Sequence, residues 1–340
     1  MAKALVLMSG GLDSILAAKV LQEQGIEVEA VSFITPFFTA KEAVKAAAVL
    51  NIPLHVVDIT DEHLSVLEEP KHGYGRFMNP CVDCHALMIR RAAQLMREIG
   101  ADFIATGEVL GERPKSQNRK ALDIVEHESG LDGYVLRPLS AKRLEPTIPE
   151  KEGLVDRDRL LAISGRSRKP QMALAEQYGI TDYPSPAGGC ILTDPMFSVR
   201  LRNLFRLEGR PSVKDINLIK VGRIFLSTEG VLIIVSRNEQ ENEILLKTAA
   251  KGDMFFEAEG YPGPLTVIPK SEAGEETIYL AAALTARYGK AKAASEVDIA
   301  TWAHGSGEKR LIRIIDPASA VDVTPAQGDE LAKVSRVMNS

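Results

Sequence analysis

The sequence has few cysteines, no long apolar run and little net charge, and each shortage excludes a class of protein. Three cysteines occur in 340 residues, and an odd number that includes Cys81-x-x-Cys84 argues against a disulfide framework. No apolar stretch approaches the roughly 20 residues that a membrane-spanning helix needs, so we expect no membrane partner. The net charge of −5 argues against indiscriminate nucleic-acid binding, so any contact with RNA must use local basic patches.

The length and the first residues indicate size and location. A chain of 340 residues with 45% hydrophobic residues is globular and large enough for two or three domains. Met1 is followed directly by a strand pattern, without room for a charged and apolar leader, so we expect a cytoplasmic protein. One local basic region comprises Arg157, Arg159, Arg166, Arg168, Lys169, Arg200, Arg202, Arg206 and Arg210.

A turn with two adjacent glycines is the most informative motif. It reads Ser9-Gly10-Gly11-Leu12-Asp13-Ser14 and lies between a strand pattern at 4–8 and a helix pattern at 15–24. Adjacent glycines let backbone N–H groups approach an anion, and the helix N-terminus that follows adds its positive dipole end. Asp13 supplies the hard oxygen ligand that Mg²⁺ prefers. Because the turn lacks the lysine of a Walker motif, it predicts a different kind of phosphate site.

Strand and helix patterns alternate through the first third of the chain. Five further elements are predicted: strands at 27–33, 54–59 and 102–105, and helices at 39–50 and 84–99. This order predicts an α/β fold, a Rossmann-like parallel sheet with helices on both faces. Since the carboxyl ends of parallel strands meet at one edge, we expect the segments 9–14, 33–38 and 106–111 to lie there. The polar and basic segment at 112–132 is predicted to be a mobile loop near the site.

The cysteines form a second group of candidate functional residues. Cys81 and Cys84 follow Pro80 at the start of a predicted helix, where the dipole lowers the pKa of a thiol and favours the thiolate. Cys190 lies in a Pro- and Gly-rich loop that can fold back over the same sheet edge. Three interpretations stay open: a [4Fe–4S] cluster held by the three cysteines with one iron open for sulfide, a persulfide pair, or zinc with His85 as fourth ligand.

The glycine turn resembles the PP-loop of the ATP pyrophosphatase superfamily. Further motifs resemble the tRNA thiouridylases of the ThiI and MnmA type, in particular their Cys-x-x-Cys branch; they are Asn79-Pro80-Cys81-Val82-x-Cys84, Thr106-Gly107-Glu108-Val109-Leu110-Gly111 and Arg137-Pro138-Leu139. The resemblance covers roughly residues 1–195. It implies ATP and Mg²⁺ as cofactors, bound at Ser9, Gly10, Gly11, Asp13, Ser14, Phe33, Thr106 and Gly107. It also implies four catalytic residues: Asp13, which binds Mg²⁺, and the cysteines Cys81, Cys84 and Cys190.

Enzymes of this type adenylate a uridine carbonyl oxygen of tRNA, release pyrophosphate and then insert sulfur. The resemblance therefore implies a tRNA sulfurtransferase that makes 4-thiouridine or 2-thiouridine. The target base must leave the RNA stack, and Arg113 and Lys115 in the basic loop are predicted to contact the RNA. In the absence of a rhodanese-like extension, we expect the sulfur donor to be sulfide or a separate carrier fed by a cysteine desulfurase.

Two other functions stay open. One is an ATP-dependent amide or nitrile synthetase that acts on a small molecule without RNA and has no need of three cysteines. The other is a non-catalytic RNA- or ribosome-binding protein that a nucleotide switches. The sequence also leaves a homodimer open.

The C-terminal part reads as a smaller α+β domain. Its predicted elements are a strand at 217–226, a hairpin partner at 230–235 and a helix at 238–250. The motifs Val221-Gly222-Arg223, Val235-Ser236-Arg237-Asn238 and Gly252-Asp253 resemble the RNA-binding domain of NFACT proteins, which implies RNA contacts by Arg223, Arg237 and Asn238. Met254 follows Asp253 where that family usually has an aromatic residue and a histidine. We therefore predict a PP-loop domain at 1–200, an RNA-binding domain at 207–325 and a C-terminal tail at 326–340.

Overall fold

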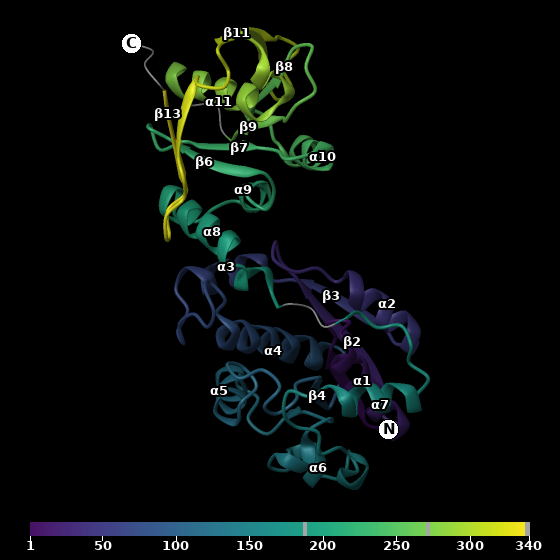
Figure 1. Cartoon of the computed structure of the whole chain (residues 1–340). Helices are drawn as coiled ribbons and strands as arrows, with labels where there is room; N and C mark the ends of the chain where they lie inside the picture. Colours follow the sequence, from purple (N-terminus) through teal and green to yellow (C-terminus); the bar gives the residue numbers. More distant parts are fainter. Residues whose placement is uncertain (186–188, 270–272, 337–340) are drawn as a thin grey trace. The chain divides into compact units, whose positions relative to one another are not determined.

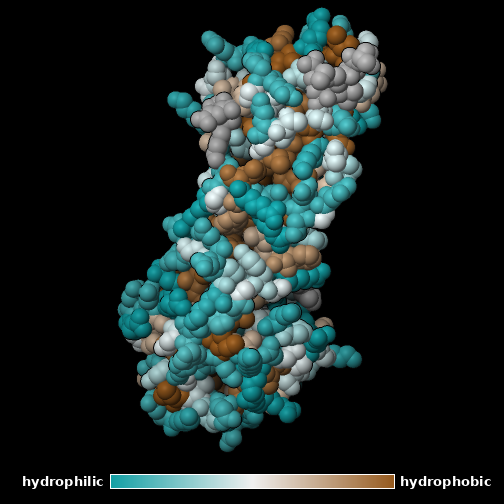
Figure 2. Space-filling model, turned by 90° about the vertical axis from the view of Figure 1, so that its left-hand side faces the viewer, coloured by the Kyte–Doolittle hydropathy of each residue, from teal (hydrophilic) through white to brown (hydrophobic). Residues whose placement is uncertain are grey.

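The computed structural model describes residues 1–185, 189–269 and 273–336, and it divides the chain into two compact units, Met1–Thr193 and Asp194–Ser340 (Figure 1). Each unit has its own sheet and its own apolar core. We predicted that the first domain ends at 200, whereas α8 (Pro195–Glu208) already belongs to the second unit. Within the described ranges, no helix combines the length and the apolar character needed to cross a bilayer. On the face shown in Figure 2, the hydrophobic residues of the N-terminal unit appear as separate small patches in a hydrophilic surface.

A five-stranded sheet forms the centre of the N-terminal unit. Its strands are β1 (Lys3–Leu7), β2 (Glu27–Ile34), β3 (Leu54–Asp58), β4 (Phe103–Thr106) and β5 (Val135–Leu136), in the order β3-β2-β1-β4-β5. All neighbouring strands are parallel, and Leu7 of β1 lies opposite both Val31 of β2 and Thr106 of β4. The predicted parallel α/β sheet is confirmed, and the carboxyl ends of β1, β2 and β4 meet at one edge.

Helices cover both faces of this sheet. They are α1 (Leu12–Glu23), α2 (Lys41–Leu50), α3 (Thr60–Glu68), α4 (Cys81–Glu98), α5 (Arg119–Ser129), the short α6 (Ile148–Lys151) and α7 (Lys169–Gln177). Successive side chains of a strand point to opposite faces. Ala4 and Val6 of β1 therefore share a core with residues of α1, α2 and α7, whereas Leu5 shares a core with residues of α4 and α5.

The segment after β4 is not the mobile loop that we predicted for 112–132, because α5 occupies much of it. The Asn118 side chain caps this helix by accepting a hydrogen bond from a backbone N–H of the first turn at 3.0 Å, and Gly130 ends it in the left-handed conformation. Leu122 and Val125 are buried, which gives the helix an apolar face. Because its other face carries many polar residues, the segment is polar on average, and its composition alone did not indicate an amphipathic helix. The predicted elements also omitted α3.

The C-terminal unit is built on an eight-stranded sheet in the order β11-β10-β8-β9-β7-β6-β13-β12. The strands are β6 (Arg223–Ser227), β7 (Leu232–Val235), β8 (Met254–Ala258), β9 (Thr266–Ile268), β10 (Glu296–Ala303), β11 (Arg310–Ile315), β12 (Val321–Thr324) and β13 (Ala332–Arg336). The helices after α8 are α9 (Val213–Leu218), α10 (Glu239–Thr248) and α11 (Glu275–Tyr288). Buried residues of α11, such as Leu280 and Leu284, share one core with Phe225 and Phe256 of the sheet.

The sequence predicted the start of this unit in part. The antiparallel hairpin of β6 and β7 and the helix α10 are confirmed. The strand predicted at 217–226 is wrong over its first residues, since α9 runs to Leu218 there and begins at a Ser212 cap. Gly222 makes the turn into β6 with φ of +76°, and a Cβ at this position would lie 2.8 Å from the carbonyl oxygen of Val235. β13 lies in the segment predicted to be a tail and pairs with both β6 and β12.

Candidate nucleotide and thiol site

The glycine turn connects β1 to α1 at the carboxyl edge of the sheet. Gly10 has φ of +80°, and a Cβ there would lie 2.2 Å from the carbonyl carbon of Glu42, so the turn requires glycine at this position. Gly11 is the N-cap residue of α1, and among the described residues no side chain caps this helix start. Ser14 Oγ donates to the Gly11 carbonyl at 2.8 Å and lies 3.3 Å from Ser9 Oγ. The first amides of α1 are therefore available for an anion, as the motif predicts.

The end of β4 presses against this turn. A Cβ on Gly107 would lie 2.5 Å from the backbone nitrogen of Ser14, so a side chain at 107 would separate the two loops. Thr106 is buried beside it and donates to Glu108 Oε2 at 3.1 Å. Phe33, by contrast, packs in the apolar core on the α4 side of the sheet, which gives its ring a structural role. Thr106 and Gly107 thus lie beside the predicted nucleotide loop, and nucleotide binding by these residues stays a prediction.

Asp13 lies in the first turn of α1, and its Oδ1 atom is buried without a hydrogen-bond partner. Burial raises the pKa of this carboxyl, and the nearby cations Arg168 and Arg113 offset only part of the effect. Glu112 lies close enough that burial and the charge of Asp13 raise its pKa as well. The sequence analysis missed Glu112 and Gln171 as neighbours of Asp13, since neither belongs to a recognisable motif.

An unpaired carboxylate oxygen beside the phosphate turn fits Mg²⁺ bound together with a nucleotide. Mg²⁺ usually takes one or two carboxylates plus substrate phosphates and water. Among the described residues, no group of three or more His, Cys, Asp or Glu side chains forms a metal site. The residues around Asp13 therefore suit an ion that arrives with ATP better than an ion held by protein ligands alone.

The three cysteines lie near one another. Cys81 is the first residue of α4, Cys84 lies one turn further and is buried, and Cys190 comes from the loop before α8. After burial, the charges of Cys190 and Cys81 are the largest causes that raise the pKa of Cys84, so the three thiols are neighbours although Cys190 is distant in sequence. Burial raises the pKa of Cys81 and Cys190 too. The predicted lowering by the helix dipole is therefore wrong, because desolvation outweighs it.

Arg113 connects the thiols with the nucleotide turn. Its charge lowers the pKa of Cys81 and of Cys190, and it also acts on Asp13. Arg113 and Lys115 are exposed, in keeping with the predicted RNA contact, which stays a prediction. The glycine turn and the cysteines, which we singled out as separate motifs, thus both lie within electrostatic reach of Arg113.

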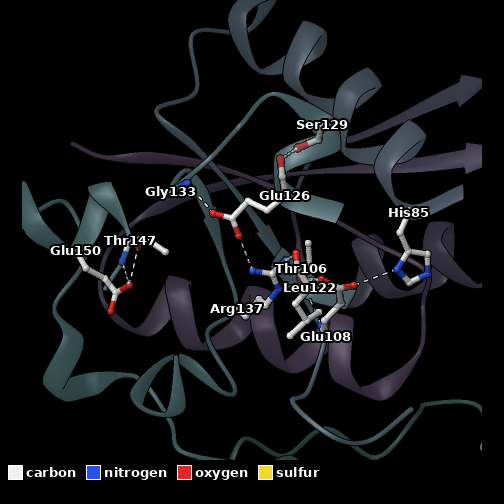
Figure 3. A network of polar contacts seen from close by, with 10 residues as sticks. All are labelled: His85, Thr106, Glu108, Leu122, Glu126, Ser129, Gly133, Arg137, Thr147 and Glu150. Carbon is white, nitrogen blue, oxygen red and sulfur yellow. Dashed lines mark hydrogen bonds and ion pairs between the residues drawn. The ribbon is translucent and has the colours of Figure 1, made fainter. Parts of the chain in front are cut away.

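A buried ion-pair network (Figure 3) includes His85, the residue that follows Cys84 in α4. His85 Nδ1 lies 3.0 Å from Glu108 Oε1, and Arg137 Nε donates to Glu108 Oε2 at 3.0 Å. Burial tends to raise the pKa of Glu108, but the charge of Arg137 and the contact with His85 lower it to about 2. His85 is thus engaged by a carboxylate, and no metal site that includes it with the cysteines is found in the described ranges. The contact uses only Nδ1 of His85, and the zinc interpretation stays a prediction, as do the cluster and the persulfide.

The arginines predicted to contact RNA in the C-terminal unit make internal contacts. Arg223 donates to the Ser236 carbonyl at 3.2 Å and lies over the Tyr288 ring at 4.8 Å. Arg237 donates to the Gly222 carbonyl at 2.7 Å, and Asn238 caps α10. These contacts hold the β6–β7 end together, and RNA binding by the three side chains stays a prediction.

The basic region predicted from 157 to 210 is divided between the two units. Arg157 donates to the carbonyls of Ala141 and Leu144 at 3.0 Å each. Arg200 is buried and donates to the carbonyls of Ile219 and Gly222. These two arginines therefore stabilise the fold of their own unit.

Two family models match the chain. Residues 2–154 match the tRNA methyl transferase HUP domain, and residues 222–324 match the NFACT protein RNA binding domain. The chain is thus similar to the HUP domain family over its first part and to the NFACT RNA-binding family over much of its second unit. The HUP match includes the PP-loop, Cys81 and Cys84, and the NFACT match includes Arg223 and Arg237, so both predicted resemblances are confirmed.

Curated relatives resemble the HUP domain. A probable tRNA sulfurtransferase of Lysinibacillus sphaericus is 30% identical over 153 residues, which cover 42% of this chain and 36% of the relative. A tRNA-specific 2-thiouridylase MnmA of Syntrophotalea carbinolica is 40% identical over 119 residues, 30% of this chain and 33% of the relative. The chain thus spans 33% to 36% of the length of these two relatives. The crystal structure of a 4-thiouridine synthetase–RNA complex with bound ATP is 23% identical over 54% of each chain with a TM-score of 0.34, a likeness too distant to bear on the site.

Proposed function

We propose that this protein is an ATP-dependent tRNA sulfurtransferase that thiolates uridine, with 4-thiouridine as product and 2-thiouridine as the alternative. The observation that carries the proposal is the position of Arg113, whose charge acts on Asp13 of the PP-loop and on the thiols of Cys81 and Cys190. A site in which a nucleotide loop and several thiols share one cation suits a reaction in which ATP activates a base and sulfur then replaces its oxygen.

The comparisons support the same reaction. The relatives that match the HUP domain are named tRNA sulfurtransferase or tRNA-specific 2-thiouridylase. The second domain matches an RNA-binding family and gives the chain a second place to hold tRNA. The proposed partners are tRNA and a sulfur donor, either sulfide or a carrier fed by a desulfurase.

In the first step, the uridine carbonyl oxygen attacks the α-phosphorus of ATP. A bond forms between this oxygen and phosphorus, the bond to the bridging oxygen breaks, and pyrophosphate leaves with the electron pair. The α1 amides offset the negative charge on the departing phosphates, and Asp13 would help to hold a Mg²⁺ ion, which would supply further positive charge there. The product is a base whose oxygen is esterified with AMP, which is a far better leaving group than oxide or hydroxide.

In the second step, sulfur adds to the same ring carbon, the carbon–oxygen bond breaks and AMP leaves. We write the step for a persulfide, since Cys81 and Cys190 are neighbouring, partly exposed thiols. Cys81 and Cys190 are better placed than Cys84, since each is only partly buried and the charge of Arg113 offsets part of the rise that burial causes in its pKa. For this step the donor is the carrier fed by a desulfurase, which transfers the outer sulfur of its own persulfide to one of the two thiolates and leaves as a thiolate. That outer sulfur then attacks the ring carbon. The other cysteine attacks the inner sulfur and releases thiouridine, and an external thiol reduces the resulting disulfide.

The test compares Asp13→Ala with Cys190→Ala on unmodified tRNA. Asp13→Ala should abolish pyrophosphate release, whereas Cys190→Ala should retain it and stop thiouridine formation. Asp123→Ala, an exposed carboxylate of α5, is the matched control and should change neither. Pyrophosphate is measured by a coupled assay, and the modified nucleoside and its position by mass spectrometry.

Each other outcome points elsewhere. Equal loss of pyrophosphate release in both variants would refute the division of labour. Pyrophosphate release that needs no RNA would favour the amide or nitrile synthetase. Anaerobically purified protein that is brown, with a broad absorbance near about 400 nm, would replace the persulfide by a [4Fe–4S] cluster.

A further inference from the structure

Three polar side chains beside Asp13 have buried atoms without hydrogen-bond partners. They are Glu112 through Oε2, Arg168 through Nε and Gln171 through both atoms of its amide. Gln171 is 0% exposed, so solvent does not satisfy it. Native proteins rarely leave buried polar groups unpaired, so a cluster of such groups beside an anion-binding turn points to a polar or charged ligand.

The fold brings these side chains together from distant parts of the sequence. Leu110 pairs with Ser164 in an isolated bridge, and Gly165 N donates to the Leu110 carbonyl at 2.7 Å. This contact joins the loop that carries Glu112 to the segment that carries Arg168. α7 follows directly, with Arg168 as its N-cap residue, and packs along α1 (Figure 1). Gln171 in the first turn of α7 therefore lies close enough to the Asp13 carboxylate to lower its pKa, although the two side chains do not meet in hydrogen-bonding geometry.

The charges of the cluster indicate what this ligand is. Asp13 and Glu112 repel each other, and Arg168 and Arg113 attract both carboxylates. Two facing carboxylates bind a divalent cation, whereas a guanidinium and an amide bind phosphate oxygens. A cation bound to a polyphosphate satisfies all of these groups together, and neither a free anion nor a free cation does so.

We propose that Glu112, Arg168 and Gln171 complete the nucleotide site opposite the PP-loop. Glu112 shares the Mg²⁺ of MgATP with Asp13, Arg168 binds a phosphate oxygen, and the Gln171 amide hydrogen-bonds the phosphates or the water molecules of the ion. This inference rests on the proposed function for its use of ATP, and tRNA and sulfur play no part in it.

The test measures binding of MgATP to the full chain by titration calorimetry without tRNA. Arg168→Ala should weaken binding tenfold or more, about the loss of one charge-assisted hydrogen bond. The matched control is Arg166→Ala, an exposed arginine of the same segment, which should stay within about twofold of the wild type. Equal affinities of Arg168→Ala and the wild type would overturn the role of Arg168.

Glu112→Gln separates binding of the ion from support of the fold. The variant should need about tenfold more Mg²⁺ for half-maximal ATP binding. In EDTA it should bind ATP at least as tightly as the wild type, because one carboxylate that repels the phosphates is gone. Its melting temperature without ligand should not fall, whereas a structural role for Glu112 predicts a fall. Equal weakening with and without Mg²⁺ would refute the shared ion.

The two proposals fail in different ways. Loss of MgATP binding in the Arg168 and Glu112 variants, together with wild-type tRNA that gains no thiouridine, would leave this inference standing and remove the proposed function. Normal MgATP binding in both variants, together with thiouridine formation by the wild type, would do the reverse.

Discussion

Arg137→Met is expected to destabilise the N-terminal unit by about 3–5 kcal/mol, because it leaves a buried carboxylate without its cation. Arg137 is 5% exposed, and it donates to Glu108 Oε2 at 3.0 Å through Nε and to Glu126 Oε2 at 2.8 Å through Nη1 (Figure 3). Methionine keeps much of the side-chain length and removes the charge. Glu108 is buried to a similar degree, so water does not replace the lost contact.

The pKa of Glu108 gives a second measure of this magnitude. Burial tends to raise the pKa, but Arg137 and His85 together lower it from 4.5 to about 2. A lowering of this size corresponds to about 3 kcal/mol in favour of the ionised form. Because the folded-state pKa lies below the unfolded-state value, this stability is fully present above pH 4.5 and is lost as the pH falls towards 2.

Urea unfolding at pH 7 tests the prediction. Far-UV circular dichroism follows both units, and the fluorescence of Trp302, the chain's single tryptophan, follows the C-terminal unit, whose transition should not move. Arg90→Met, an exposed arginine that donates to the Glu128 carbonyl at 2.8 Å, is the control and should cost less than about 1 kcal/mol. A similarly small cost for Arg137→Met would contradict the reasoning. The reasoning would also be contradicted if the free energy of unfolding of a Glu108→Gln/Arg137→Met double variant fell by the sum of the losses in the two single variants.

Three further predictions concern single positions. Gly10→Ala should weaken ATP binding tenfold or more and lower the melting temperature, because the new Cβ would lie 2.2 Å from the carbonyl carbon of Glu42. Calorimetric titration and thermal unfolding measure the two effects. The control is Gly25→Ala, where φ is +78° but nothing lies within 4 Å, so it reports backbone strain alone. Asn118→Ala removes the cap of α5 and should cost about 1 kcal/mol in urea unfolding. Burial lowers the pKa of His63 from 6.5 to about 4, so the free energy of unfolding of the wild type should fall as the pH falls from 6.5 to 4. Urea unfolding at pH 7 and pH 5 measures this loss, which should be smaller in His63→Leu.

The parts of the fold that depend on local pattern could be predicted from the sequence. The apolar runs of β1, β2 and β4 predict buried parallel strands, and the glycine turn after β1 predicts the anion-binding start of α1. The position of Cys190 depends on the path of the chain after α7, and the expectation that its loop returns to the sheet edge agrees with the structure.

Other features depend on burial, which a linear pattern does not contain. The helix dipole at Cys81 suggested a thiolate, but the structure buries the thiol, and desolvation raises its pKa. α5 was missed because its apolar stripe is narrow and its other residues are polar. Gln171 lies in an ordinary helical sequence, and only the packing of α7 on α1 turns it towards Asp13.

The surroundings of an unpaired buried group separate a structural role from a functional one. Both ring nitrogens of His63 lack partners, as do both amide atoms of Gln171. His63 lies against the rings of Phe37 and Phe38, with centroids 5.4 and 5.5 Å away, and its lowered pKa keeps it neutral. A neutral ring among aromatic side chains packs as part of the core and requires no ligand. Gln171 lies instead beside the charges of Asp13 and Arg168, each of which also has a buried unpaired atom. Such a polar and charged group is what the proposed MgATP site requires.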